Sequence, residues 1–131
     1  MRRQFDLLPN DETFLNDYGL PWESVLDGSR WVLIHDFPLP PGYTVRKATA
    51  AIRIETGYPN VELNMVYFHP RIAREDQQRI GATDAQQVIE SKTYQRWSRH
   101  RSKQNPWRIG FDSLETHIIL VEDWLERELL K

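Results

Sequence analysis

One apolar stripe near the end of the chain constrains the fold more than any other feature of the sequence. Its side chains recur at intervals of three and four residues, which places them on one face of an α-helix; they are Leu114, Ile118, Val121, Leu125 and Leu129. Asp112 and Glu115 have the spacing of a capping box for this helix, and Asp123 and Arg127 can pair across one of its turns. Because such a helix buries only one face, it needs another layer of structure to pack against.

That second layer is predicted to be a β-sheet. The first strand is predicted over Trp31–Asp36 and the second over Ala48–Glu55, where side chains alternate between two faces. A third strand is predicted through Val61–Phe68, which has the same two-residue period. Leu39–Tyr43 and Gly57–Asn60 are predicted turns, because proline and glycine interrupt a strand ladder. Short connections of this kind indicate an antiparallel meander.

Helices and loops account for the rest of the prediction. Asn10 is expected to cap a short helix over Asp11–Tyr18, with Gly19 as its stop. Trp22–Leu26 is expected to add one more helical turn, and His69–Ser91 is read mostly as loop with room for a short helix. The sequence therefore predicts an α+β fold, with an N-terminal and a C-terminal helix outside one antiparallel sheet.

The composition is that of one ordinary globular domain over residues 1–131, with 40% hydrophobic and 27% charged residues. A net charge of −2 provides no overall attraction to nucleic acid or to an anionic membrane. The N-terminal residues lack the apolar core of a signal peptide, and no apolar run is long enough to span a bilayer. We therefore expect a cytoplasmic protein without membrane attachment.

The chain contains no cysteine, which excludes disulfides, thiolate metal sites and thiol nucleophiles. His35 and His117 have no second histidine or acid at metal-ligand spacing, and no glycine-rich phosphate loop is present. We therefore expect no metal site and no cofactor.

The run Tyr94–Arg101 holds the densest group of chemically capable side chains. It combines arginines with an imidazole, an indole and a hydroxyl, and it lies within a basic stretch, Lys92–Arg108, that contains no acid. Several guanidinium groups close together repel one another unless an anion or an acidic partner balances them. The run therefore indicates contact with an anionic tail or an acidic partner.

Several motifs give the chain a resemblance to ubiquitin-conjugating enzymes. They are the turns Leu39–Tyr43 and Gly57–Asn60, a strand that ends in Val66–Pro70, the Trp-Ser-Arg-His tetrad within Tyr94–His100, and Asn105–Gly110 before the last helix. More narrowly, the chain resembles the prokaryotic family-E ubiquitin-conjugating-enzyme-like proteins. The resemblance implies the ubiquitin-conjugating fold. It also implies a cytoplasmic bacterial protein that works with an activating enzyme, a ubiquitin-like modifier and a metallopeptidase.

The resemblance also implies a position for the reactive residue. In ubiquitin-conjugating enzymes a cysteine after the Tyr-Pro strand carries the modifier as a thioester, but the corresponding stretch here, Arg79–Asp84, has no thiol. Ala82 or Thr83 lies near that position. A hydroxyl needs an adjacent base to be a good nucleophile, and Ser98 and His100 face the same side only in an extended strand. Thr83 and Ser98 are therefore candidate acceptor hydroxyls, with His100 as base or oxyanion stabiliser.

The other members of the basic run are assigned to modifier binding, together with the tryptophan that follows it: Arg96, Trp97, Arg99, Arg101 and Trp107. A structural interpretation remains open for each of them. Tryptophan most often lies in a core with its N–H bonded to backbone, and a row of arginines can be a solvated face.

Three functions remain open at this point. The favoured one is a component of a bacterial modifier pathway that accepts or positions the activated modifier C-terminus for acyl transfer, through a hydroxyl if an ester forms. The second is a non-catalytic module of the same fold that binds the modifier or the activating enzyme. The third is binding of single-stranded nucleic acid by stacking and charge, which the negative net charge and the acidic last helix disfavour.

Overall fold

The computed structural model describes residues 1–131. In chain order, its elements are α1 (Pro9–Tyr18), β1 (Trp22–Leu26), β2 (Arg30–Pro38), β3 (Lys47–Ile54), β4 (Val66–His69), β5 (Gln86–Ile89), β6 (Lys92–Trp97) and α2 (Leu114–Glu128). The strands form one sheet in the order β1-β2-β3-β4-β6-β5, and every neighbouring pair is antiparallel. The predicted α+β class is therefore confirmed, and the predicted meander corresponds to β2, β3 and β4.

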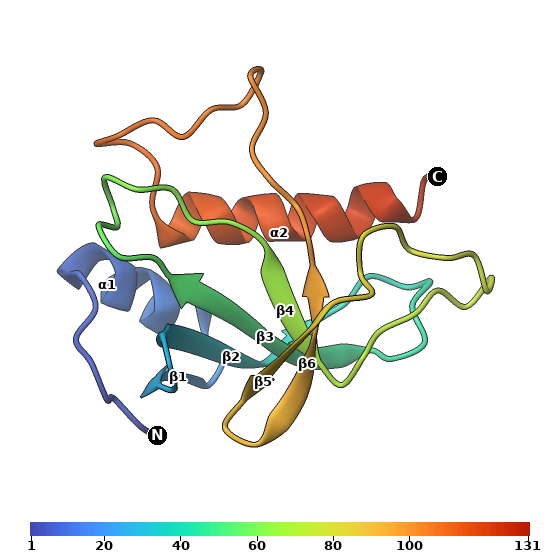
Figure 1. Cartoon of the computed structure of the whole chain (residues 1–131), viewed down its shortest axis with the longest axis horizontal. Helices are drawn as coiled ribbons and strands as arrows, with labels where there is room; N and C mark the ends of the chain where they lie inside the picture. The colour runs from blue at the N-terminus through green and yellow to red at the C-terminus, as the bar shows by residue number, and fades with distance from the viewer.

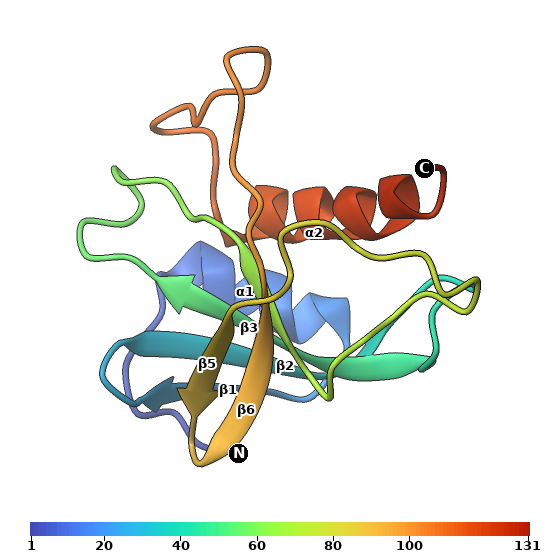
Figure 2. The ribbon, with the colours of Figure 1, turned by 45° about the vertical axis from the view of Figure 1, so that its right-hand side comes forward.

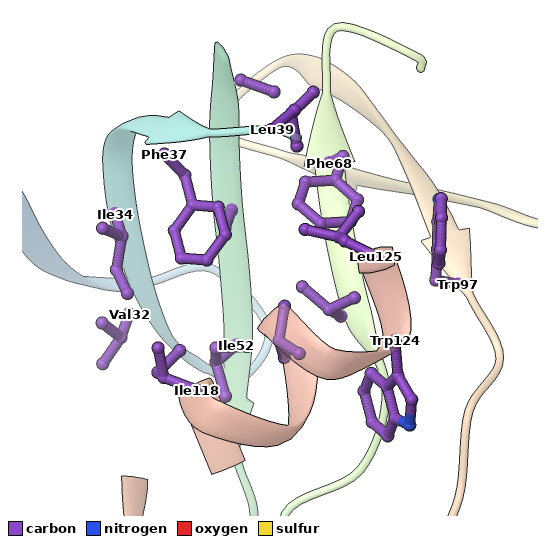
Figure 3. Close-up of a cluster of buried hydrophobic side chains, with 14 of the residues drawn as sticks. Val32, Ile34, Phe37, Leu39, Ile52, Phe68, Trp97, Ile118, Trp124 and Leu125 are labelled. Carbon is purple, nitrogen blue, oxygen red and sulfur yellow. The ribbon is translucent and has the colours of Figure 1, made fainter. Parts of the chain in front are cut away.

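Helix α2 crosses one face of the sheet (Figure 1). Its apolar stripe is buried as predicted in the positions that face the sheet, including Ile118 and Leu125. Figure 3 shows Ile118 beside Ile52 and Leu125 against Phe68, with Trp97 on the other side of Phe68. The predicted pair Asp123–Arg127 is also present on the solvent side, at 3.1 Å. Helix α1 contributes Leu15 to the same cluster of 22 buried residues.

The sheet is curled, so its other face also encloses a core. The β5–β6 hairpin lies across the face turned away from α2 (Figure 2). Beneath it is a second cluster of seven buried residues, made of Val25, Trp31, Leu33, Ala51, Tyr67, Ile89 and Tyr94. The hairpin tip is fixed at Glu90, whose N–H donates to the Asp27 carboxylate (2.7 Å) and whose own carboxylate accepts from Arg2 (2.8 Å). These contacts bring the two ends of the sheet close together.

The first helix begins earlier than predicted. Helix α1 starts at Pro9 rather than Asp11, with Leu8 as the N-cap and no side-chain cap, so Asn10 lies inside the first turn. Proline is favoured at the first helical position because its missing N–H would have no partner there. Gly19 ends the helix as predicted, in the left-handed conformation with φ of 86°.

The predicted helical turn at Trp22–Leu26 is wrong, because these residues form β1. They pair with β2 through a tight connection in which Gly28 has φ of 70°, a conformation that glycine adopts without strain. The outer edge of β1 is bridged in turn by the N-terminal arm, defined here as Arg2–Gln4. The Ser24 N–H donates to the Arg2 carbonyl (3.0 Å), and the Gln4 N–H donates to the Ser24 carbonyl (2.8 Å).

Strand β4 is shorter than the strand predicted over Val61–Phe68. The chain leaves the sheet before Val66, because Met65 has φ of 62° and its N–H donates to the Arg99 carbonyl (3.0 Å) instead of to a strand. Leu63 is nevertheless fully buried in the larger cluster. Its burial explains why the alternation of apolar and polar residues begins before β4 itself.

The segment His69–Ser91 contains β5 and no helix. Strand β5 gives little sequence signal, because it has only four residues, two of them glutamines, and only Ile89 is buried. Glu90 and Ser91 have φ of 52° and 66°, as in a two-residue hairpin turn. Such turns usually contain asparagine and glycine, so the sequence Glu-Ser does not indicate a hairpin turn.

The cap of α2 is shifted by one residue from the prediction. Ser113 is the N-cap, and its capping box is completed by Thr116 rather than by the predicted pair Asp112 and Glu115. The Asp112 carboxylate instead accepts the backbone N–H of Arg108 (2.7 Å). A threonine hydroxyl at this position serves the same purpose as the expected glutamate, because it accepts the Ser113 N–H (3.0 Å).

Candidate functional site

Strand β6 carries the first half of the basic run and sends alternate side chains to opposite faces of the sheet. Tyr94 belongs to the smaller core on one face, and Trp97 belongs to the larger core on the other. The Trp97 side chain is fully buried, and its indole N–H donates to the Gln95 side-chain oxygen (3.1 Å). Its ring packs edge-on against Phe68 (Figure 3). Trp97 therefore packs in the core under the basic run, and its side chain is not accessible to a partner.

Arg99 is bound within the molecule. Its guanidinium donates to the Gly81 carbonyl (3.0 Å) and to the Glu128 carboxylate (3.4 Å), and it lies over the Trp97 ring at 4.9 Å. The side chain therefore connects the loop after β4, strand β6 and the end of α2.

Arg101 is more deeply enclosed, with only 4% of its side chain exposed. It pairs with the buried Asp112 carboxylate at 3.5 Å and lies over the Trp107 ring at 5.0 Å. The Trp107 indole N–H donates to the Pro59 carbonyl (2.9 Å), and its ring packs against Tyr58. These contacts fix the long segment between β6 and α2. Trp97 and Tyr94 are buried and offer no open aromatic face for stacking of bases, and the Trp107 ring is partly covered by Arg101 and Tyr58.

Ser98 and His100 are close in sequence but do not form a hydrogen-bonded pair. The Ser98 hydroxyl accepts the Arg96 Nε–H (3.1 Å), and its backbone N–H donates to the Ala82 carbonyl (3.0 Å). The chain leaves β6 after Trp97, so the extended strand that would align the two side chains ends before them. The His100 side chain is exposed, and it makes no hydrogen bond. The arrangement provides Ser98 with a cation beside it rather than a base.

Thr83 is brought next to Ser98 but is enclosed. Only 2% of the residue is exposed, and its hydroxyl donates to the Ile80 carbonyl (2.9 Å). Ala82, the other residue at the expected reactive position, is exposed and has φ of 55°. The loop 81–83 and the residues 98–99 thus lie side by side, although the loop threonine has a local structural bond.

A buried carboxylate that the sequence did not single out organises this region. Glu128 is 3% exposed and lies within 3.5 Å of Arg74, Arg99 and Lys131. It follows Leu125 by three residues, so it occupies the buried face of α2. An acid on an otherwise apolar helical stripe is the signal that could have identified it, because a buried charge requires partners.

A shallow cavity of about 450 Å³ lies beside Glu128. It is lined by Arg99, His100, Trp124, Arg127, Glu128, Leu130 and Lys131. Its wall therefore carries three permanent cations and one imidazole against a single acid. No group of three or more histidine, aspartate and glutamate side chains is arranged to hold a metal ion.

Comparison with known families identifies the family of the chain. The sequence matches the family described as Prokaryotic E2 family E over residues 7–128. The chain belongs to the prokaryotic E2 family E. This family-E protein thus combines an E2-like α+β fold with a complete absence of cysteine, and its family gives it a ubiquitin-conjugating-like role in a bacterial modifier pathway. It has no significant match among curated proteins or solved structures, and none of its helices is long and apolar enough to cross a membrane.

Proposed function

We propose that this family-E protein binds a ubiquitin-like modifier and positions its activated C-terminus for acyl transfer, in the cytoplasm and together with an activating enzyme. The observation that carries the proposal is the E2-like fold in which the loop at the expected reactive position, residues 81–83, lies against Ser98 without any thiol. A thioester cannot form on this chain, so holding the modifier is the part of the family's role that the geometry supports best.

The cavity beside Glu128 supports the binding step. Arg127 and Lys131 are exposed in its wall, with 64% and 70% of their side chains accessible, and His100 is exposed nearby. A carboxylate or an acidic patch of the modifier would add hydrogen bonds from these cations. In this proposal Arg99 contributes charge to the cavity wall and Arg96 contributes charge beside Ser98, whereas Trp97, Arg101 and Trp107 act indirectly by fixing the backbone.

An oxyester is the second candidate, and Ser98 is the better of its two acceptors. The Ser98 hydroxyl only accepts a hydrogen bond, from Arg96, so its own proton is free. The Thr83 hydroxyl is enclosed and already donates to a carbonyl. His100 would have to turn toward Ser98 to act as base or as oxyanion stabiliser.

Reconstitution with the modifier, the activating enzyme and ATP tests both possibilities. We expect saturable binding of the modifier by calorimetry, and an Arg127→Glu variant should bind about tenfold more weakly, which corresponds to about 1.4 kcal/mol. Lys92→Glu is the matched control, because it reverses an exposed charge at the far end of β6. It should leave the affinity unchanged.

Intact-mass spectrometry of the same mixture separates the two candidates. A hydroxylamine-labile adduct that disappears in Ser98→Ala supports the oxyester, whereas binding without an adduct supports positioning alone. If the wild-type protein binds neither the modifier nor the activating enzyme while that enzyme is charged, the proposed function is wrong.

A further inference from the structure

A polar cluster lies at one end of the sheet face that is turned away from α2. Side chains at alternate positions share a face of a strand, so His35 follows the buried Trp31 and Leu33 of β2 on that face. Thr49 lies on the same face of β3, two residues before the buried Ala51. The apolar core beneath the β5–β6 hairpin therefore ends in hydrogen-bonding groups.

Three of these groups form a continuous hydrogen-bonded relay. The His35 Nε2 atom lies 2.7 Å from Glu23 Oε2, and the His35 Nδ1 atom lies 3.1 Å from Thr49 Oγ1. They come from three adjacent strands, β1, β2 and β3, so the sheet itself sets their spacing. A hydroxyl, an imidazole bonded to it and a carboxylate that orients the imidazole are the elements of an activated nucleophile.

The carboxylate determines which nitrogen of the imidazole is basic. Glu23 also accepts hydrogen bonds from Arg2, whose Nε lies 3.0 Å from Oε1. This bond, together with the one from His35, lowers the pKa of Glu23 to about 2 against the opposing effect of burial. An ionised carboxylate can only accept, so His35 Nε2 carries the proton that Glu23 accepts. In the neutral ring Nδ1 is then an acceptor, and Thr49 donates its hydroxyl proton to it.

No other serine or threonine hydroxyl of the molecule has such a partner. Ser98 accepts from an arginine and Thr83 donates to a backbone carbonyl. Thr49 is partly exposed, and 25% of the His35 side chain is accessible. Directly across the ladder, His69 of β4 is in register with Thr49. The hydroxyl is therefore polarised, and it belongs to a residue that is partly exposed to solvent.

We propose that Glu23, His35 and Thr49 form an acyl-acceptor site that takes acyl groups from activated donors such as esters, thioesters and acyl adenylates. The Thr49 oxygen attacks the carbonyl carbon of the donor, and its proton passes to His35 Nδ1. The bond to the leaving group then breaks, and the leaving group departs with the electron pair and takes the proton from His35. The products are a threonine ester and the free alcohol, thiol or phosphate, and nothing is oxidised or reduced.

This inference extends the proposed function, because the activated C-terminus of a modifier is one such donor. Its test nevertheless uses a small ester and needs no modifier. An acylated Thr49 in a protein that fails to bind any modifier would overturn the proposed function alone. Modifier binding without reaction at Thr49 would overturn this inference alone.

The experiment is acetylation of the purified protein by p-nitrophenyl acetate. We expect release of p-nitrophenolate with one hydroxylamine-labile acetyl group, which peptide mapping locates on Thr49. Thr49→Val, which keeps the shape and removes the hydroxyl, should lose this adduct, and Thr49→Ser should keep it. His35→Gln should slow its formation by roughly 10²-fold or more. Thr56→Val is the matched control, because it removes an exposed threonine hydroxyl that has no histidine partner, and it should react like the wild type.

Glu23 acts through His35 and is a positioning residue. Glu23→Gln should change the nitrogen chemical shifts of the His35 ring, which report the tautomer, as well as slow the acetylation. Thermal unfolding of each variant establishes that it is folded. If folded Thr49→Val gains the same hydroxylamine-labile adduct, or if the wild type is acetylated only on lysine amines, the inference is wrong.

Discussion

His117 is a fully buried histidine on α2 that the molecule keeps neutral. Its Nε2–H donates to the Met65 carbonyl (2.8 Å), and its Nδ1 atom has no hydrogen-bond partner. Burial lowers the pKa of His117 to about 4, and the nearby Arg101 charge acts in the same direction. A proton on this ring would be enclosed between apolar side chains and a cation.

The stability of the protein should therefore fall when the pH decreases from about 6.5 to about 4. In this window the unfolded chain binds a proton at residue 117, whose ordinary pKa is 6.5, while the folded chain does not. The loss amounts to about 3 kcal/mol, because one pKa unit corresponds to about 1.4 kcal/mol. Urea unfolding of the wild type and of His117→Gln over this range measures it. Parallel pH curves for the two proteins would contradict the assignment.

The sequence identifies the basic run as a cluster of arginines, but it does not identify the partners of those arginines. Arg99 and Arg101 are balanced by Glu128 and Asp112, which lie beyond the basic run, on α2 and just before it. The run itself contains no acid, so its sequence did not indicate these acidic partners. Only the folded structure shows which arginines are already paired with an acid of the same chain and which are unpaired.

At the scale of elements, the segment between β6 and α2 has no regular secondary structure and depends on side chains for its conformation. The Arg101–Asp112 pair links the two ends of this segment, and the hydrogen bond from the Trp107 N–H to the Pro59 carbonyl fixes its middle to the loop before β4. Because both members of the pair are almost fully buried, loss of one leaves the other as an uncompensated charge.

Arg101→Gln should destabilise the protein by about 3 kcal/mol, as expected when a buried carboxylate loses its cation. Hydrogen exchange should become faster first in residues 98–112. Arg108→Gln is the matched control, since Arg108 also approaches Asp112 (3.6 Å) but has 59% of its side chain exposed. It should cost less than 1 kcal/mol. Equal losses in the two variants, measured by urea unfolding, would show that burial does not determine the energetics of this pair.

The sequence predicts elements well where the apolar pattern is long and regular. The apolar period of α2 and the alternation in β3 were sufficient to predict these two elements, because each element buries one whole face. β1, β5 and β6 were missed because their neighbours decide their conformation. Trp22–Leu26 becomes a strand by pairing with β2, and Gln86–Ile89 becomes one by pairing with β6. No local pattern predicts the nearness of loop 81–83 to Ser98, which arises when the loop pairs with the end of β6.

At the scale of the whole molecule, two cores on opposite faces of one sheet give the fold its shape. The larger core lies under α2, and the smaller core requires the β5–β6 hairpin to curl over β1 and β2 (Figure 2). Ile89 is the contribution of the edge strand β5 to the smaller core and is fully buried. It therefore couples the curl of the sheet to the stability of the hairpin that carries the basic run.

Ile89→Ala should cost about 3 kcal/mol by leaving a cavity beneath the hairpin. Its neighbour Val88 is 57% exposed, and Val88→Ala should cost less than 1 kcal/mol. Chemical denaturation gives both values, and hydrogen exchange should show the β5–β6 hairpin opening first in Ile89→Ala. If hydrogen exchange became faster to the same extent in all strands of the sheet, the idea that the hairpin opens and closes as a unit would be wrong.

The N-terminal arm has a consequence for behaviour in concentrated solution. Unpaired strand edges are the places where copies of a protein join into larger assemblies and precipitate. Here the arm Arg2–Gln4 covers part of the β1 edge, and the opposite edge belongs to β5, which is only four residues long. Removal of the arm by a protease would uncover β1 and make self-association through that edge easier. An intact arm thus serves solubility as well as fold.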